Sequence, residues 1–272
     1  MNLRCGRFSL PLERPLVMGV VNVTPDSFSD GGRYLDANAA IAHARAMIDE
    51  GMDLVDVGGE STRPGAAPVS EAEELARILP VVKDLRDFPV SVDSRHPNVM
   101  RAALDAGAAM INDIEALTAP GALAAVAQSD CAVCLMHKKG SPATMQEDPH
   151  YADVVAEVRS YLGERIAACE AAGITRERIV ADPGFGFGKT VEHNLILLKR
   201  LPELASLGVP LLAGWSRKSS LGRITGRDTG ERLAGSLAAA LLALLGGARI
   251  LRVHDVKETR DAVLVWEAWR KA

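Results

Sequence analysis

The sequence predicts an α/β fold: a (β/α)8 TIM barrel with a short N-terminal hairpin that closes the barrel bottom. Eight short apolar runs recur along the 272 residues at a mean spacing of about 33, near the roughly 31 residues per unit of such a barrel. Helical stretches separate these runs, and apolar strands that alternate with helices form a parallel sheet covered by helices. An open doubly wound sheet is the alternative, but eight units without an obvious reversal favour the closed barrel.

Strands are expected where an apolar run ends in a polar residue. In chain order they cover residues 17–22, 54–59, 90–93, 109–113, 133–137, 179–182, 211–216 and 249–254. Their polar residues are Asn22, Asp56, Asp93, Asn112, His137, Asp182, Ser216 and His254. Residues 1–16, with the segment FSLPLERP, predict the hairpin. The chain has no linker-like segment, so we expect a single domain over 1–272.

Residues that begin and end helices separate the strands. The helix expected over 37–50 follows Asp36 and ends at Gly51. Ser70 and Glu73 form the pattern of a capping box before the next helix. Later helices show Pro at the start or Gly past the end, which is the usual asymmetry. These residues are Pro97, Gly107, Gly173 and Gly208.

Composition and charge exclude several classes of protein. A net charge of −4 argues against a nucleic-acid partner. The longest uncharged stretch, 233–248, is shorter than the ~20 residues of a membrane span, and the N-terminus lacks the apolar core of a signal peptide. We therefore expect a cytoplasmic protein. Cys131 and Cys134 stand three apart on an expected strand, so they point to opposite faces and cannot share a metal.

Active sites of such barrels lie at the C-terminal ends of the strands, where the polar residues fall. Buried polar groups need hydrogen-bond partners, so a rim of carboxylates and amides indicates a polar site rather than structural plugs. The members of this rim are Asn22, Asp56, Asp93, Asn112 and Asp182.

Cations gather at the same rim, which indicates a bound anion. They are Arg63, Lys138, Lys139, Lys189, Arg217, Lys218, Arg252 and His254. We interpret Lys138, Lys139 and Lys189 as solvated loop charges, whereas Arg252 lies inside an apolar run. The segment SRKS, 216–219, combines hydroxyls, cations and an expected helix N-terminus, which is typical of a phosphate site.

The glycine-rich segment DPGFGFGKT follows the sixth expected strand, and its spacing does not match a P-loop. Phe187, near Asp182, is a candidate wall of an aromatic substrate pocket. The alternative is that Phe185 and Phe187 both pack against the barrel. The long polar loops NVTPDSFSDGG and GGESTRPGA are expected to close over substrate.

These motifs resemble those of the dihydropteroate synthase family. MGVVNVTPDSFSDGG, DVGGESTRPGA, SVDS, INDI, LMH, DPGFGFGK, SRKS, ERLAGSLA and RVHDV occur in the family's order over 18–256. The resemblance implies a pterin-binding barrel that acts as a transferase in folate biosynthesis. The reaction condenses 6-hydroxymethyl-7,8-dihydropterin diphosphate with 4-aminobenzoate to 7,8-dihydropteroate and diphosphate. The resemblance also implies Mg2+ as cofactor and a homodimer.

The resemblance assigns roles to matching positions. Asn22 would contact the metal with the diphosphate. The pterin diphosphate would be held by Thr62, Asp93, Asn112, Asp182, Lys218, Arg252 and His254. The 4-aminobenzoate site, where sulfonamides compete, would comprise Phe28, Arg63, Pro64, Phe187 and Ser219. Within these sets the catalytic residues would be Asp93, Arg63, Lys218, Arg252 and His254.

The chemistry of the substrates fits these assignments. The Asp182 carboxylate can accept an amino group and a ring N–H side by side, and Asn112 offers a donor and an acceptor to the rest of the ring edge. Loss of diphosphate leaves a cation that Asp93 is a candidate to stabilise, while Mg2+, Arg252 and His254 neutralise the diphosphate. The amine of 4-aminobenzoate is already nucleophilic, so no activated Ser or Cys is needed.

The chain departs from the family's usual pattern at Ser94, His96, Lys138–Lys139 and Trp215. Two other functions stay open. A methyltransferase domain that presents methyltetrahydrofolate to a corrinoid protein would have less need of TPDSFSDGG, STRPG or SRKS. A non-catalytic pterin-binding paralogue should have lost a cation or loop residue, whereas Asn22, Arg63, Lys218, Arg252 and His254 are all present.

Overall fold

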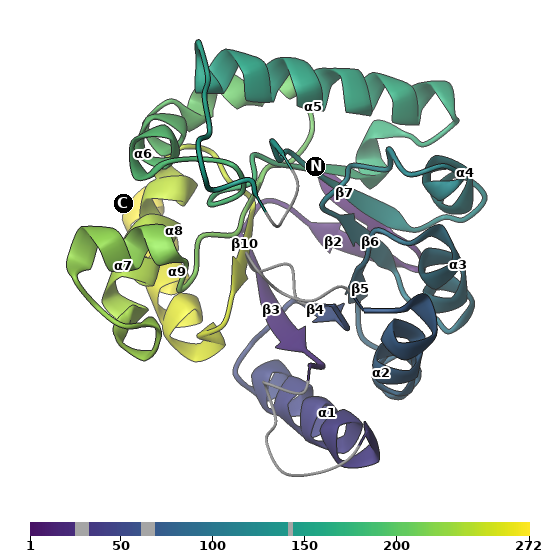
Figure 1. Ribbon diagram of the computed structural model, residues 1–272. Coiled ribbons are helices and arrows are strands. Elements are labelled where there is room, and N and C mark those ends of the chain that lie inside the picture. Colours follow the sequence, from purple (N-terminus) through teal and green to yellow (C-terminus); the bar gives the residue numbers. More distant parts are fainter. Residues whose placement is uncertain (25–32, 61–68, 141–143) are drawn as a thin grey trace.

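A nearly closed barrel of parallel strands forms the centre of the molecule (Figure 1). The computed structural model describes residues 1–24, 33–60, 69–140 and 144–272. The sheet order is β8-β7-β6-β5-β4-β3-β10-β9, and a parallel bridge between Ala181 and Leu211 joins its two edges. The strands are β3 (Leu16–Asn22), β4 (Leu54–Gly58), β5 (Val90–Asp93), β6 (Met110–Asp113), β7 (Ala132–Met136), β8 (Ile179–Asp182), β9 (Leu212–Ala213) and β10 (Ile250–Val253). The predicted fold class is confirmed.

Helices surround the barrel on its outside (Figure 1). They are α1 (Arg33–Asp49), α2 (Glu71–Asp84), α3 (Pro97–Asp105), α4 (Ala122–Ala127), α5 (Val154–Ala171), α6 (Val191–Lys199), α7 (Ser219–Thr225), α8 (Leu233–Leu245) and α9 (Val256–Lys271). Short 3-10 turns lie at η2 (Arg176–Arg178), η3 (Leu201–Leu207) and η4 (Thr229–Glu231). Among the described residues, no helix has the length and apolar character needed to cross a membrane.

Two predicted boundaries differ from the structure by more than one residue, and one predicted capping box is only half formed. Helix α1 begins at Arg33 rather than after Asp36, so Asp36 lies inside the helix and is not its N-cap. Strand β9 is limited to Leu212–Ala213, since only these two residues pair with β10. Ser70 caps α2 as predicted, with its side chain accepting the N–H of Glu73 at 3.3 Å. The Glu73 carboxylate, however, pairs with Arg77 one turn further along the helix.

The N-terminal hairpin closes one end of the barrel, as predicted. Strands β1 (Asn2–Cys5) and β2 (Phe8–Pro11) pair antiparallel. Leu3 and Cys5 are fully buried in a cluster with residues from the strand interiors, including Met110 and Cys134. Burying a side chain such as Leu3 stabilises the fold by about 2 kcal/mol. The hairpin is therefore a hydrophobic plug. It seals the end of the barrel opposite the C-terminal ends of the parallel strands.

Strand residues alternate between this interior cluster and the layer under the helices. Cys134 belongs to the interior cluster and Cys131 to the core between strands and helices. All four cysteines are buried and free. The expectation that Cys131 and Cys134 point to different faces is confirmed.

Candidate active site

The alternation of the strands places the site directly above the plugged barrel interior. Successive residues on one face of a strand are two apart. Leu54, Met110, Val180 and Ile250 fill the interior, and the residues two further along are Asp56, Asn112, Asp182 and Arg252. The barrel interior therefore changes from apolar to charged at this level. Four residues of the predicted rim, Asp56, Asp93, Asn112 and Asp182, lie in a single cluster with Arg252.

Asp56 is the centre of this cluster. It is fully buried and accepts hydrogen bonds from Ser91 Oγ at 2.6 Å, from Asn112 Nδ2 at 3.0 Å and from Arg252 Nε at 2.6 Å. The Arg252 guanidinium also reaches Asp93 Oδ2 at 2.9 Å. Sequence reasoning counted Asp56 among the rim residues without giving it a role. The structure shows that it orients Asn112 and Arg252.

The arrangement leaves an acceptor without a partner in the pocket. Asn112 gives one N–H of its amide to Asp56, which leaves its second N–H and its Oδ1 for other partners. Its Oδ1 is buried and has no hydrogen-bond partner within the described residues. A buried acceptor left unpaired costs about 1–3 kcal/mol. Such a group indicates a ligand that donates to it.

A small pocket lies beside this acceptor. Its lining combines the polar cluster with a few apolar side chains: Asp93, Asn112, Ile114, Met136, Asp182, Phe187, Gly214, Lys218 and Arg252. Asp182 Oδ1 accepts the N–H of Gly184 at 2.7 Å, which fixes the orientation of the carboxylate. Asp93, Asn112, Asp182, Phe187, Lys218 and Arg252 are thus brought together as predicted.

Burial shifts the titration of the pocket's charged groups. It raises the pKa of Asp93 to about 7, against the lowering effect of Arg252, and the neighbouring Asp56 raises it further. Burial likewise raises the pKa of Asp182, which the Lys218 ammonium opposes. For Lys218, burial lowers the pKa to about 7, against the raising effect of Asp182. Strongly shifted groups in one pocket are typical of functional sites.

The two phenylalanines after β8 have different environments. Phe185 is fully buried and stacks on Trp215 with ring centroids 4.9 Å apart. Phe187 lines the pocket, and Lys218 Nζ lies 4.3 Å from its ring centroid. The pocket-wall interpretation therefore holds for Phe187 and the packing alternative for Phe185. Ser219 is exposed and is the first residue of α7.

The SRKS segment is held by contacts with α8 and with the residues that follow β10. Arg217 has a φ of +57°, which is unfavourable for a residue with a side chain. Its backbone N–H donates to Ser236 Oγ at 2.9 Å, and its guanidinium pairs with Asp255. Ser216 Oγ lies 3.1 Å from His254 Nδ1. Arg217 is therefore engaged with Asp255 and is not among the pocket's lining residues.

The interpretation of three lysines as solvated charges is partly wrong. Lys139 is half-exposed and pairs with Glu157 at 2.9 Å. Lys138 is mostly buried and pairs with Glu115 at 2.7 Å. Lys189 is only 3% exposed, and its amine lies among backbone carbonyls. The presence of a lysine in the sequence does not by itself indicate whether its side chain is buried or solvated.

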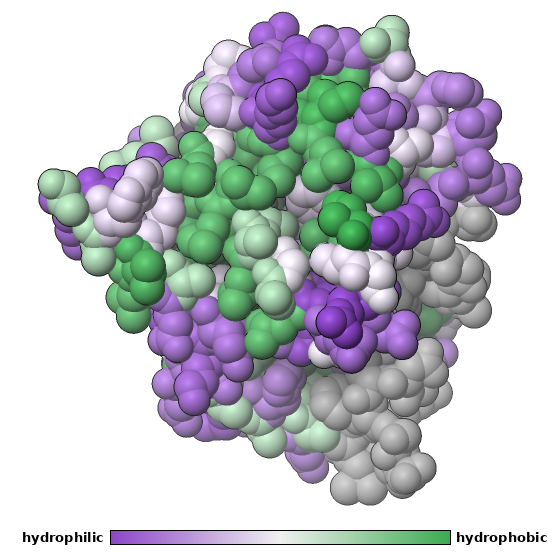
Figure 2. Space-filling model, turned by 90° about the vertical axis from the view of Figure 1, so that its left-hand side faces the viewer, coloured by the Kyte–Doolittle hydropathy of each residue, from purple (hydrophilic) through white to green (hydrophobic). Residues whose placement is uncertain are grey.

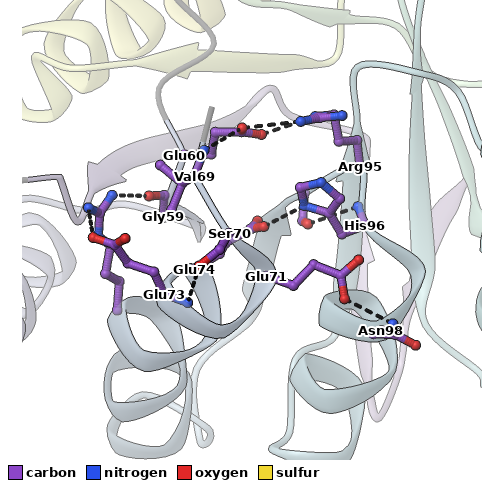
Figure 3. A network of polar contacts seen from close by, with 12 residues as sticks. Gly59, Glu60, Val69, Ser70, Glu71, Glu73, Glu74, Arg95, His96 and Asn98 are labelled. Atoms are coloured by element: carbon purple, nitrogen blue, oxygen red, sulfur yellow. Dashed lines mark hydrogen bonds and ion pairs between the residues drawn. The ribbon is translucent and has the colours of Figure 1, made fainter. Parts of the chain in front are cut away.

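A network of charged groups fixes the described ends of the connection between β4 and α2 (Figure 3). The Glu60 carboxylate accepts the N–H of Val69 at 3.2 Å and the Arg95 guanidinium at 3.1 and 3.2 Å. Beside it, Glu74 of α2 contacts His96 Nδ1 at 2.7 Å. Sequence reasoning missed this network. The unusual His96 was its only available signal.

Several residues predicted for the site lie outside the described residues. They are Phe28, Thr62, Arg63 and Pro64, with most of the two long loops that carry them. Asn22 ends β3, and His254 follows β10, so both lie at the rim as predicted.

Comparisons with known proteins agree over almost the whole chain. A family model described as pterin binding enzyme matches residues 18–254. The dihydropteroate synthase of Escherichia coli K12 is 53% identical over 271 residues, covering 98% of this chain and 96% of the relative. That of Neisseria meningitidis serogroup B is 52% identical, covering 97% and 96%.

Solved structures give the same result. The Xanthomonas albilineans dihydropteroate synthase with 4-aminobenzoic acid has a TM-score of 0.94 and 54% identity, covering 100% of this chain and 98% of that chain. The same enzyme in complex with 7,8-dihydropteroate has a TM-score of 0.92 and 51% identity, covering 100% of both. The Yersinia pestis enzyme with a sulfonamide drug complex has a TM-score of 0.95 and 47% identity, again covering 100% of both.

Proposed function

Since this chain belongs to the pterin-binding family of dihydropteroate synthases, we propose that it makes 7,8-dihydropteroate. It condenses 6-hydroxymethyl-7,8-dihydropterin diphosphate with 4-aminobenzoate and releases diphosphate, as a transferase of folate biosynthesis. The observation that carries this proposal is the unpaired, buried Asn112 Oδ1 in the same pocket as the fixed Asp182 carboxylate.

The pterin edge matches these two groups. The amino group and adjacent ring N–H of a pterin donate side by side, and the Asp182 carboxylate is an acceptor for both. A further ring N–H donates to Asn112 Oδ1 and so satisfies the buried acceptor. Lys218, with its ammonium beside Asp182, supplies the complementary donor to the ring. All three side chains line the pocket.

The reaction breaks one C–O bond and forms one C–N bond. The bond between the pterin methylene and diphosphate breaks, and its electron pair leaves with the diphosphate. The Asp93 carboxylate stabilises the positive charge that develops on the methylene and ring. The amine nitrogen of 4-aminobenzoate then bonds to the methylene and loses a proton. The protein's main contribution is to hold the two substrates in this geometry.

The diphosphate lies at the cationic part of the mouth in this proposal. Arg252 and His254 bind it from the end of β10, with Arg252 also flanking the pterin ring. The Arg252 guanidinium is oriented for this by Asp56 and Asp93. Thr62 and Arg63 bind from the loop between β4 and α2. These roles rest on the family resemblance and on the placement of Arg252 and His254.

A Mg2+ ion fits the same region through Asn22. Asn22 Oδ1 lies 3.7 Å from the position that a Cβ on Gly58 would occupy, so Gly58 leaves room beside the amide. Mg2+ takes oxygen ligands and usually keeps waters and substrate phosphates, so one protein oxygen suits an ion that arrives with diphosphate. Within the described residues, no three His, Cys, Asp or Glu side chains group as a separate metal site. When bound, Mg2+ would offset the charge of the leaving diphosphate.

The 4-aminobenzoate ring is placed against Phe187 and the stem of Lys218. Its carboxylate is received at Ser219, the first residue of α7. Phe28, Arg63 and Pro64 complete this side of the site, where a sulfonamide would compete. The support from the structure is that the Phe187 ring lines the pocket and lies under the Lys218 amine.

A homodimer and a cytoplasmic location complete the proposal, with the whole chain as one pterin-binding domain. Exposed apolar side chains gather over neighbouring helices α7, α8 and α9, on the face that Figure 2 shows. They are Ile224, Leu242, Leu245, Leu264, Val265 and Trp269. An apolar face of this kind typically marks a protein interface. Four free, buried cysteines are consistent with a reducing compartment.

The test is product formation from the purified protein. The protein is mixed with Mg2+, the pterin diphosphate and 4-aminobenzoate, and 7,8-dihydropteroate and diphosphate are measured by chromatography. Equal amounts of both products are expected. Pterin binding without product would favour the non-catalytic paralogue. Binding of methyltetrahydrofolate in preference to the pterin diphosphate would favour the methyltransferase domain.

A further inference from the structure

Lys189 is a buried cation that has no role in the proposed reaction. It is 3% exposed, and its amine lies 3.0 Å from His137 Nδ1, 2.9 Å from Gly184 O and 3.1 Å from Phe187 O. A fourth, longer contact reaches His137 O at 3.4 Å. Each of these partners can accept a hydrogen bond, and an ammonium group has three to donate. Lys189 thus connects three backbone or ring acceptors at once.

These acceptors belong to two separate parts of the barrel mouth. His137 follows β7, whereas Gly184 and Phe187 belong to the connection from β8 to α6. Gly184 has a φ of +69°, and a Cβ there would lie 1.9 Å from His137 O. The connection between β8 and α6 therefore packs closely against His137, and the Lys189 amine bonds to both.

The same connection carries groups of the pocket at both ends. It begins after Asp182, which accepts the Gly184 N–H, and it contains Phe187, whose ring lies beneath Lys218. Strand β8 anchors Asp182 through its pairing with β7. Phe187 lies beyond the strand, and its carbonyl is bonded to Lys189. Loss of the Lys189 amine should therefore move Phe187 more than Asp182.

We propose that Lys189 is a positioning residue for the 4-aminobenzoate side of the site. Its amine fixes the connection between β8 and α6 onto His137 and so holds the Phe187 ring as a wall of the pocket. This inference rests on the proposed function for its substrate. It adds a residue that touches neither substrate and acts through Phe187.

The charge states of the pair agree with this geometry. Burial, with the nearby Lys189 charge, lowers the pKa of His137 to about 3, so its imidazole is neutral and can accept at Nδ1. Burial lowers the pKa of Lys189 to about 7, against the raising effect of Asp182. The acceptors around the amine favour its charged form.

The test compares Lys189→Met with Lys139→Met. Both substitutions remove an amine from the same rim, but Lys139 is half-exposed and contacts Glu157. For Lys189→Met we expect a KM for 4-aminobenzoate raised at least tenfold, with the dissociation constant for the pterin changed less than threefold. We expect Lys139→Met to leave both constants near wild type.

A second readout reports the connection without any turnover. The Trp215 ring stacks on Phe185, within the same connection, so the near-UV circular dichroism of Trp215 should weaken in Lys189→Met and not in Lys139→Met. If Lys189→Met does not fold, Lys189→Gln is measured instead, because its amide keeps two donors; we expect a smaller rise in KM.

The outcomes separate the inference from the proposed function. An unchanged KM for 4-aminobenzoate in a folded variant would overturn the inference, and so would an equal loss of pterin affinity. A wild-type chain without product would contradict the proposed function alone. In that case an unchanged Trp215 signal in Lys189→Met would still overturn the role of Lys189.

Discussion

The proposed roles of Asp182 and Asn112 depend on which of their hydrogen-bonding atoms are not already bonded to neighbouring residues. Gly184 occupies one oxygen of Asp182, and Asp56 occupies one amide N–H of Asn112. The second Asp182 oxygen and Asn112 Oδ1 are acceptors that need a ligand donor, while Asn112 keeps a second N–H to donate. Residue types alone predict a polar site here, whereas the orientation of the Asn112 amide, with Oδ1 left unpaired, follows from its contact with Asp56.

Replacing Asp182 by asparagine tests this directly. The oxygen of the new amide can keep the Gly184 contact, but the NH2 group then faces the donors of the pterin. Hydrogen bonds to a charged group contribute about 1.5–3 kcal/mol each, so we expect a loss of about 3 kcal/mol, or roughly 100-fold in pterin affinity. Isothermal titration calorimetry measures it, with the exposed Asp105→Asn as control. Wild-type affinity in Asp182→Asn would exclude Asp182 from the pterin site.

The pH dependence of turnover reports Asp93 and Lys218. Asp93 must be ionised to stabilise positive charge, so activity rises as pH rises through its pKa of about 7. Lys218 must be protonated, so activity falls as pH rises through its pKa of about 7. A bell-shaped profile of kcat/KM centred near neutrality is expected. In Asp93→Asn the acidic limb should disappear; its persistence would assign that limb to another group.

The N-terminal hairpin and the site occupy opposite ends of the barrel. Leu3 is fully buried in the plug, so Leu3→Ala should lower the free energy of unfolding by about 3 kcal/mol. KM for both substrates should not change, because the plug lies below the polar cluster. Urea unfolding and steady-state kinetics measure the two effects, with the exposed Arg4→Ala as control. A raised KM would show that the plug also shapes the pocket.

Strand order and strand-end residues were predictable because each β strand carries its own signal. An apolar run that ends in Asn, Asp or His identifies both the strand and its active end. Helix boundaries were less predictable: Asp36 is a suitable capping residue, yet α1 starts at Arg33. Burial of Lys189 and the stacking of Phe185 on Trp215 were not predictable, since both depend on contacts between segments distant in the sequence.

The apolar face of α7, α8 and α9 is exposed and does not pack against the barrel (Figure 2). The Ala/Leu-rich helix α8 packs on the barrel through Ala239 and Ala243 and exposes Leu242 and Leu245. Sequence reasoning left a partner-facing and a barrel-facing helix as alternatives. The structure shows that α8 has both kinds of surface.

A charged substitution on this face should separate the subunits of the proposed homodimer. We expect Leu245→Glu to shift the sedimenting species from dimer to monomer at micromolar concentration, because a buried unpaired carboxylate is costly. Ala124→Glu on α4, which lies on the other side of the barrel in Figure 1, is the matched control. A wild-type chain that sediments as a monomer would remove the dimer from the proposal.

In the proposed complex, the pterin ring binds with its donor edge on Asp182 and Asn112. A crystal structure of this chain with bound 7,8-dihydropteroate would show whether the ring takes this position. We predict a ring N–H donor within about 3.2 Å of Asn112 Oδ1, with the amino group and its neighbouring N–H on the Asp182 carboxylate. A ring bound elsewhere on the barrel, or one that leaves Asn112 Oδ1 without a donor, would exclude this mode of pterin binding.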